Sequence, residues 1–307
     1  MDLSTARYGS YYAGWLIRSY LGNKRPLVST IIIHYKCNLK CQHCSIAANQ
    51  EIMPYPRSIS FENASKDMQE TFDRGARILF FEGGEPTIWT DGDKDLSDLI
   101  EEGRRIGYYV IGYTTNGIGK IFEQSDVVSV SLDGPREIHD LIRGPGVFDR
   151  LMENLGRTKH TNIFANMVVT RTNIDRVRAT AEVVAKTPSV RGMMINFLTP
   201  PPYDISLTLE QKKKVVEEVR ALKKEGLPIV NSNNALKELL FEDYSKKCPY
   251  WISSFTMPDG RKYHGCPMEG TESCKNCGFD AVREYRLITR GDIGTISKMS
   301  RFALSKQ

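Results

Sequence analysis

Cys37-Asn38-Leu39-Lys40-Cys41-Gln42-His43-Cys44 places three cysteines within eight residues, at the spacing C-x3-C-x2-C. The stretch follows the β-branched, apolar run 28–33, which predicts a buried strand. Cysteines this dense, in a long chain with an odd total of seven, indicate metal ligation in a reducing compartment and not a disulfide framework. We therefore expect a metal-binding loop at the end of the first strand.

The number of ligands in this loop distinguishes between an iron–sulfur cluster and a zinc site. A cubane iron–sulfur cluster usually takes four cysteines, and no fourth cysteine is close in the sequence. A cluster held by Cys37, Cys41 and Cys44 would therefore leave one iron open. A zinc site completed by His34 or His43 is the alternative, but structural zinc ligands usually come in pairs from two separated segments.

The spacing resembles the cluster loop of the radical S-adenosylmethionine (SAM) enzymes. His43 takes the place of the aromatic residue that commonly precedes the last cysteine in that family. The resemblance implies a [4Fe-4S] cluster whose open iron binds SAM through its amino and carboxylate groups. It also implies that one electron, supplied by a reductase or ferredoxin, breaks the sulfonium bond and gives a 5′-deoxyadenosyl radical.

Short β-branched runs alternate with helical windows from residue 28 to residue 197. Crossovers of this length between nearly continuous apolar strands predict a parallel sheet with helices outside it. We expect an α/β fold, a partial (β/α)6 TIM-like barrel, with its active site at the C-terminal strand ends. The expected strands are 28–35, 77–81, 108–113, 127–132, 164–169 and 192–197, and the expected helices between them are 61–72, 96–105, 147–155 and 174–185.

A second motif, Gly83-Gly84-Glu85-Pro86, follows the second expected strand. Adjacent glycines let the backbone approach a ligand closely, and a carboxylate beside them can bind an ammonium group. The motif resembles the Gly-Gly-Glu-Pro element of the same family. By that match Gly83, Gly84 and Glu85 bind the methionyl end of SAM.

Polar residues end the later strands as well. Ser131 and Asp133 open a Ser-Leu-Asp-Gly … His-Asp … Arg-Gly … Phe-Asp pattern, which is similar to that of radical SAM enzymes with auxiliary clusters. The resemblance implies that both residues approach the SAM ribose. Asn166 and Asn196, on the fifth and sixth strands, are expected near polar groups of SAM by position alone.

Two further motifs are expected to be structural. For His139-Asp140, helix capping or loop ordering is favoured over catalysis, because such side chains bond readily to nearby backbone. Tyr113-Thr114-Thr115-Asn116-Gly117 predicts a tight turn that shapes the floor of the site.

The other four cysteines, Cys248, Cys266, Cys274 and Cys277, lie in the C-terminal part of the chain. Four thiolates suit a fully ligated second cluster or a zinc site, and the spacing does not choose between them. Radical SAM enzymes with SPASM- or twitch-like extensions carry an auxiliary cluster there, so the resemblance implies a second [4Fe-4S] cluster. We expect an N-terminal helix over 1–27, the barrel over 28–200 and a cluster-bearing extension over 201–307.

Both ends of the chain are similar to the hopanoid-modifying radical SAM adenosyltransferase family. The similar segments are 13–28, Cys248-Pro249-Tyr250-Trp251, Gly265-Cys266-Pro267 and 274–278. That resemblance implies a lipid or isoprenoid substrate. Modification of a peptide or a small metabolite is the alternative, and the start of the first strand at residue 28, with no separate peptide-binding domain before it, counts against a peptide. A non-catalytic metal-binding or redox-sensing protein is the alternative from another class.

Composition predicts a soluble globular protein, with 40% hydrophobic and 26% charged residues. A net charge of +5 is too small to indicate a nucleic-acid partner. We find neither an apolar run of membrane-spanning length nor a signal-peptide pattern and expect a cytoplasmic protein. The aromatic segment 11–21 predicts a helix packed on the domain. The alternative is an interfacial helix, with Trp15 at headgroup depth and Arg18, Lys24 and Arg25 toward anionic lipid, which would contact the membrane surface.

Overall fold

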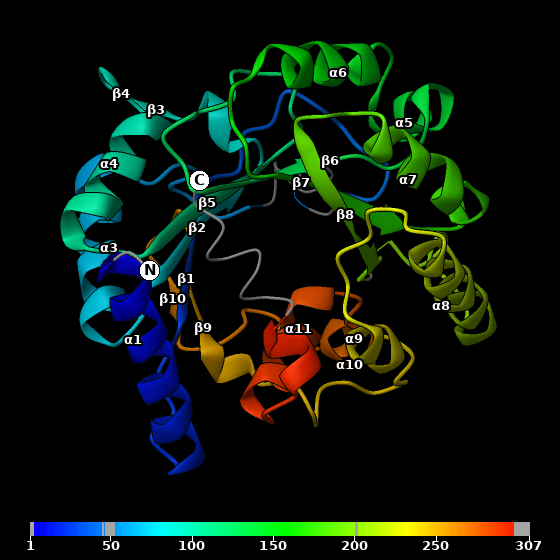
Figure 1. Ribbon diagram of the computed structural model, residues 1–307. Coiled ribbons are helices and arrows are strands. Elements are labelled where there is room, and N and C mark those ends of the chain that lie inside the picture. Colours follow the sequence, from blue (N-terminus) through cyan, green and yellow to red (C-terminus); the bar gives the residue numbers. More distant parts are fainter. Residues whose placement is uncertain (1–2, 45, 47–52, 200–201, 298–307) are drawn as a thin grey trace.

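The fold is built on one curved, mostly parallel sheet. The computed structural model describes residues 3–44, 46, 53–199 and 202–297. Its eight strands have the order β10-β9-β1-β2-β5-β6-β7-β8, and all neighbours are parallel except β9 and β10 (Figure 1). The strands are β1 Val28–His34, β2 Ile78–Gly83, β5 Val110–Thr115, β6 Val127–Ser131, β7 Ile163–Val169, β8 Val190–Phe197, β9 Ser253–Thr256 and β10 Lys262–Tyr263.

The six expected strands are all present and pair in chain order, which confirms the predicted α/β fold with a parallel, barrel-like sheet. Their ends differ from the expected ones by at most two residues. Two short strands, β3 Thr90–Asp91 and β4 Lys94–Asp95, form a separate hairpin beside the barrel.

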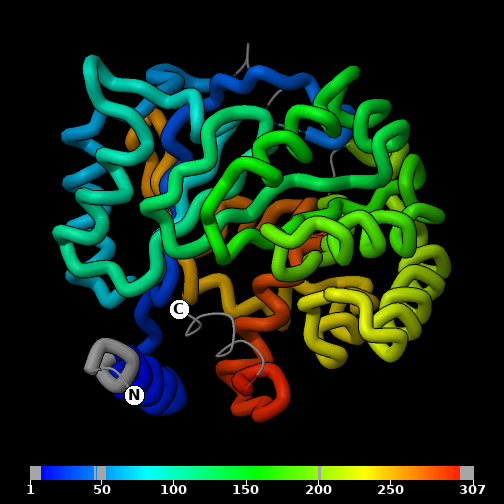
Figure 2. The backbone as a smooth tube through the Cα atoms, turned by 45° about the horizontal axis from the view of Figure 1, so that its top comes forward, coloured from blue at the N-terminus to red at the C-terminus, as the bar shows by residue number. Residues whose placement is uncertain are grey.

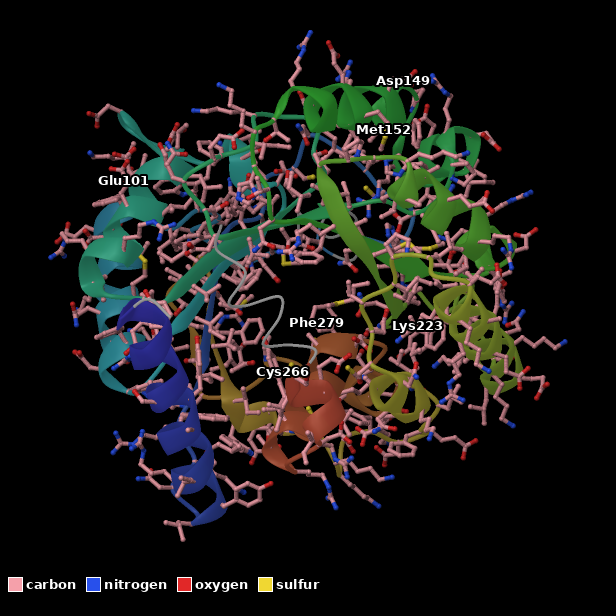
Figure 3. All side chains as sticks on the ribbon, in the orientation of Figure 1. Glu101, Asp149, Met152, Lys223, Cys266 and Phe279 are labelled. Carbon is pink, nitrogen blue, oxygen red and sulfur yellow. The ribbon has the colours of Figure 1, made fainter. Side chains whose placement is uncertain are left out.

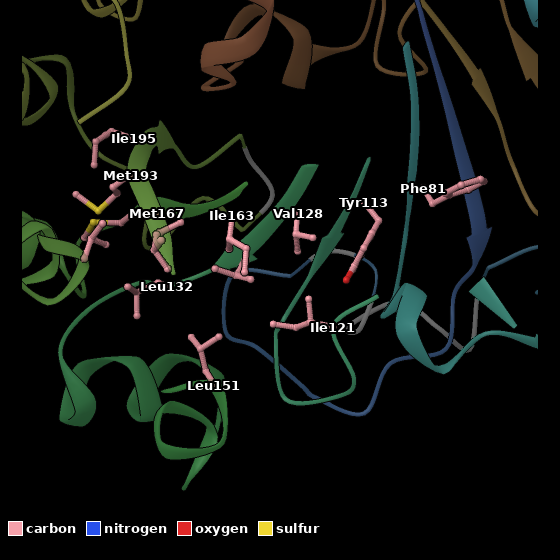
Figure 4. Packing of buried hydrophobic residues seen from close by; sticks show 14 of the residues in the cluster. Phe81, Tyr113, Ile121, Val128, Leu132, Leu151, Ile163, Met167, Met193 and Ile195 are labelled. Atoms are coloured by element: carbon pink, nitrogen blue, oxygen red, sulfur yellow. The ribbon is translucent and has the colours of Figure 1, made fainter. Parts of the chain in front are cut away.

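Helices cover the outer face of the sheet and bury one side of each strand. In β2, Leu79 and Phe81 are fully buried in the core shared with these helices. Figure 4 shows part of this layer, with Leu151 of α6 directed at the strands that carry Val128 and Ile163. The outer helices are α3 Phe61–Asp73, α4 Leu96–Ile106, α5 Arg136–Arg143, α6 Val147–Arg157, α7 Val177–Ala185 and α8 Leu209–Lys224.

The C-terminal part closes the open side of the partial barrel. Strand β9 pairs in parallel with β1 at one edge of the six expected strands. At the other edge, Phe197 N–H donates to the carbonyl of Gly278 at 3.0 Å, and Gly278 N–H donates to Thr199 Oγ1 at 2.9 Å. In Figure 1, α11 (Asp280–Thr289) lies between β9 and β8, close to α9 (Asn233–Glu238) and α10 (Glu272–Lys275).

Strand β9 is missing from the expected strands because Ser253-Ser254-Phe255-Thr256 lacks an apolar run. Ser254 and Thr256 are buried instead, where β9 pairs with the first strand. The sheet therefore contains two strands more than predicted, and the C-terminal part shares it with the barrel.

Helix α1 (Leu3–Tyr20) packs at the N-terminal ends of the strands. Trp15 is 4% exposed, stacks on Trp251 with ring centroids 5.7 Å apart and donates from Nε1 to the carbonyl of Arg25. The Tyr11 hydroxyl donates to the carbonyl of Gly75. Figures 1 and 2 show α1 at the same end of the molecule as α11.

This packing is what the sequence predicts for a helix docked on the domain. Trp15 lies inside the protein and is not available at headgroup depth, whereas Ile17, Tyr20 and Leu21 stay exposed. Contact of α1 with a membrane surface stays a prediction. Within the described residues no helix has the length and apolar character to cross a membrane.

Candidate functional site

A cavity of about 310 Å³ lies at the C-terminal ends of the strands. Because these ends meet at one edge of a parallel sheet, motifs far apart in the sequence meet there. All the site residues expected in the barrel line this cavity except Asp133. They are Cys37, Cys41, His43, Cys44, Gly83, Gly84, Glu85, Ser131, Asn166 and Asn196.

The glycines of the Gly-Gly-Glu turn pack against the chain that leads into the cluster loop. Gly84 N–H donates to the carbonyl of His34 at 2.8 Å, and Glu85 N–H donates to the carbonyl of Lys36 at 2.9 Å. A Cβ on Gly84 would lie 2.0 Å from the Lys36 oxygen, and one on Gly83 would lie 2.3 Å from the His34 oxygen. The two glycines therefore allow the turn to lie close to the backbone of His34 and Lys36. Contact of these glycines with SAM stays a prediction.

The Glu85 carboxylate is buried and firmly held. Its Oε1 accepts from the hydroxyl of Thr115 at 2.6 Å and from the backbone and hydroxyl of Thr87. Its Oε2 accepts from Asn116 N–H at 2.7 Å. A carboxylate offers about four acceptor positions, so Oε2 can still accept from an ammonium group. The Thr115-Asn116 turn, expected only to shape the site, thus orients the predicted SAM-binding carboxylate.

Asp133 takes a different position from the one expected. It is fully buried and pairs with Arg143 Nε at 2.7 Å and His43 Nε2 at 3.2 Å. Burial alone would raise the pKa of Asp133, but the Arg143 guanidinium and the His43 ring hold it well below its usual range. Asp133 is absent from the cavity lining. Contact of Asp133 with the SAM ribose stays a prediction. In the structure, Asp133 holds the side chains of Arg143 and His43 beside the cluster loop.

Arg143, at the end of α5, is a residue that the sequence analysis did not select. Its Nη1 lies 3.7 Å from Cys41 Sγ, within reach of a hydrogen bond to sulfur, and its Nη2 lies 3.5 Å from His43 Nε2. Its guanidinium lines the cavity. The only sequence signal was its place in the quoted Arg-Gly pattern.

His139 and Asp140 order the chain around this pair, as expected. Asp140 accepts from the N–H groups of Gly146 and Phe148 at the start of α6, each at 2.8 Å. His139 Nδ1 accepts from Asp133 N–H at 3.2 Å. Burial, reinforced by Arg143, lowers the pKa of His139 to about 4, so its ring is neutral at physiological pH.

Asn166 and Asn196 connect the barrel to the C-terminal part. Asn196 Nδ2 donates to Asn166 Oδ1 at 2.5 Å, and Asn196 Oδ1 accepts from Asp280 N–H at 2.7 Å. Both side chains line the cavity. Their contacts with SAM stay predictions, because these amide groups already bond to each other and to α11.

The second set of cysteines lies in the segment that closes the barrel. Figure 3 labels Cys266 of this set and Phe279, which lines the cavity. Burial raises the pKa of Cys248 to about 12 and that of Cys266 to about 11, and the neighbouring cysteines add to both shifts. Metal binding must therefore displace protons from these thiols.

A buried cation faces this second set. Arg283 is fully buried, donates to the carbonyl of Cys277 at 2.6 Å and places Nη1 3.9 Å from Cys277 Sγ. A buried charge needs a partner of opposite sign, and none of the ion pairs between described side chains includes Arg283. Thiolates held by a metal centre would provide that negative charge, so the donor chemistry fits such a group.

The described cysteines are all free, and no three described His, Cys, Asp or Glu side chains are grouped to hold a single metal ion. In a cubane each thiolate binds a different iron, so its ligands do not have to converge on one point.

Comparison with known proteins adds the family. Residues 31–184, half of the chain, match the model of the Radical SAM superfamily. Mycofactocin maturase MftC of Mycolicibacterium smegmatis is 30% identical over 197 residues, which are 56% of this chain and 47% of that protein. The AdoMet-dependent heme synthase of Oleidesulfovibrio alaskensis is 33% identical over 150 residues, 45% of this chain and 37% of that protein.

The fold also agrees with solved structures. The structure of anSMEcpe with bound AdoMet and Kp18Cys peptide superposes with a TM-score of 0.61 at 19% identity, over 89% of this chain and 84% of that one. The chain spans about half the length, or less, of the curated relatives described above. The family model covers the strands that carry the three-cysteine loop and the Gly-Gly-Glu turn, so the chain belongs to the radical SAM superfamily, whose members use a [4Fe-4S] cluster and SAM.

Proposed function

We propose that this radical SAM enzyme modifies a peptide. The observation that carries the proposal is the cavity in which Cys37, Cys41 and Cys44 meet the Gly-Gly-Glu turn and polar strand ends. Support for a peptide comes from the relative named a maturase and from the anSMEcpe structure, which holds AdoMet and a peptide. An isoprenoid chain, favoured by the sequence, would leave the hydroxyl groups of Thr114 and Ser131, which line the cavity, without partners.

The residues of the chain bind, orient and enclose the reactants. Cys37, Cys41 and Cys44 would hold the cluster and leave one iron for SAM. SAM, once reduced there by an electron from a reductase or ferredoxin, supplies the 5′-deoxyadenosyl radical. Glu85 Oε2 is placed to accept from the SAM ammonium, and the cavity walls would surround the reactive carbon.

The first prediction tests the reaction. Anaerobically reconstituted wild type with dithionite should convert SAM to 5′-deoxyadenosine, measured by mass spectrometry. Cys41→Ala should give only background, because two thiolates in this loop cannot hold the cluster. The matched control is Cys248→Ala, outside the loop, which should keep SAM cleavage. Cleavage by Cys41→Ala at the wild-type rate would refute the assignment.

A second prediction concerns the C-terminal cysteines, which we propose hold a second [4Fe-4S] cluster. Wild type should contain about eight irons per chain, and Cys274→Ala/Cys277→Ala about four. Iron and sulfide analysis with Mössbauer spectroscopy measures both. Four irons and one zinc in wild type would contradict the second cluster.

The heme synthase relative supports a second candidate, the modification of a small metabolite. The two candidates differ in the origin of the abstracted hydrogen. Deuterium from a labelled peptide should appear in 5′-deoxyadenosine if a peptide is the substrate.

A further inference from the structure

Glu82, the residue before the Gly-Gly-Glu motif, lines the cavity and belongs to β2. Side chains alternate between the two faces of a strand. Leu79 and Phe81 are buried in the core beneath the outer helices, so Glu82 points to the inside of the barrel. The family motif begins at Gly83 and leaves Glu82 out.

Two glutamates line the cavity, and they differ in their partners. Both oxygens of Glu85 accept hydrogen bonds from Thr87, Thr115 and Asn116. Glu82, in contrast, has no hydrogen bond or ion pair with any residue that the structure describes. Arg143, the lining cation, is already paired with Asp133.

None of the described residues supplies a counter-charge to Glu82. Burial raises the pKa of Glu82, with no described cation to oppose it. Tyr285 of α11 is near enough for the Glu82 carboxylate to add to the rise in its pKa, which burial raises to about 12. Tyr285 itself packs on the cluster that includes Trp15 and Ile252, at the floor of the barrel. Glu82 is therefore on the wall of the lumen, between the floor and the cluster loop.

We propose that Glu82 binds a cationic group of the substrate, an ammonium or a guanidinium, inside the barrel. A partly buried carboxylate without a partner is unfavourable, and a cation that enters the lumen reduces this cost. For the peptide proposed above, on which this inference rests, the group is a lysine or arginine side chain or a free amino terminus. SAM is a second source of positive charge, but its ammonium has a placed acceptor in Glu85 Oε2.

The test measures binding, so it does not depend on turnover. The full chain, with both clusters reconstituted and SAM present, is titrated with N-acetyl-Gly-Lys-Gly-amide and with the same peptide carrying norleucine in place of lysine. We expect wild type to bind the lysine probe about tenfold more tightly, the value of a hydrogen bond to a charged group. Glu82→Gln should remove this preference and leave the affinity for SAM unchanged.

Two further measurements separate the ways in which the proposal can fail. Butylamine and butanol, compared by ligand-observed NMR, test the cation site without a peptide, so a charge preference lost in Glu82→Gln supports the site even if the peptide proposal fails. Equal binding of all charged and neutral probes to wild type, or an undiminished preference in Glu82→Gln, overturns it. A weaker affinity for SAM with the probe preference intact assigns Glu82 to SAM and overturns the substrate role. Iron content equal to wild type establishes that the variant is folded.

Discussion

Gly84→Ala should lose the catalytic cluster and all SAM cleavage. The new Cβ would lie 2.0 Å from the Lys36 oxygen and 2.4 Å from its carbonyl carbon. Both are backbone atoms, which no rotamer change can move, and the next residue is the first cysteine of the loop. The segment must shift, so we expect iron to fall from about eight to about four per chain if the second cluster remains. Iron analysis, the EPR signal of the reduced cluster with SAM, and 5′-deoxyadenosine formation measure the loss.

Gly156→Ala is the matched control. Gly156 lies in α6, and a Cβ there meets nothing within 4 Å. Because alanine favours a helix over glycine by about 1 kcal/mol, this variant should keep its iron and activity and unfold at slightly higher temperature. Full iron content and wild-type SAM cleavage in Gly84→Ala would show that the turn does not position the loop.

Arg143→Gln should destabilise the fold and lower the reduction potential of the catalytic cluster. Without the guanidinium, the fully buried Asp133 keeps only the His43 ring as a described side-chain partner. Breaking a buried ion pair from one side costs about 3–5 kcal/mol. The N–H group 3.7 Å from Cys41 Sγ is also lost, and such groups stabilise the more negative, reduced cluster. Denaturation under anaerobic conditions and a redox titration followed by EPR measure the two effects.

The double variant Asp133→Asn/Arg143→Gln separates charge pairing from the effect on the cluster. Stability should recover in part, because no unpaired carboxylate remains, while the reduction potential stays below that of wild type.

The pH dependence of the stability of Arg143→Gln has a defined sign. Arg143 helps hold the pKa of Asp133 below its unfolded value, so the pair stabilises wild type at neutral pH and loses this effect only in acid. The deficit of Arg143→Gln should therefore narrow as the pH falls. A deficit that is constant with pH, or full recovery of the potential in the double variant, would contradict this account.

The parts of the site that lie on strand ends could be predicted from the sequence. Periodicity identified the six strands, and their shared direction brought the cysteine loop, Glu85 and Ser131 to one cavity. Asp133 lies two residues beyond the end of β6, where strand alternation no longer fixes the direction of a side chain. Its burial depends on Arg143, ten residues later on a helix, and sequence spacing contains no information on that pairing.

The resemblance that suggested a lipid substrate rests on segments that do not line the cavity. The N-terminal segment 13–28, which suggested a lipid, lies at the opposite ends of the strands from the cavity and contributes no lining residue among those described. Glu82, in contrast, stands next to the most informative turn in the sequence. Strand alternation alone predicts that the Glu82 side chain points into the barrel. That Glu82 has no described partner can be seen only once the neighbouring segments of the fold are in place.

The pairing of β9 with β1 has a consequence for biosynthesis. It joins Val28 to Ser253, 225 residues later in the chain. At ribosomal rates of about 5–20 residues per second, β9 is synthesised roughly 10–45 s after β1. Throughout that time β1 has an unpaired edge, a known starting point for aggregation, beside the three cysteines of the cluster loop. A chaperone or cluster-delivery protein that protects this edge would act while the chain is still on the ribosome.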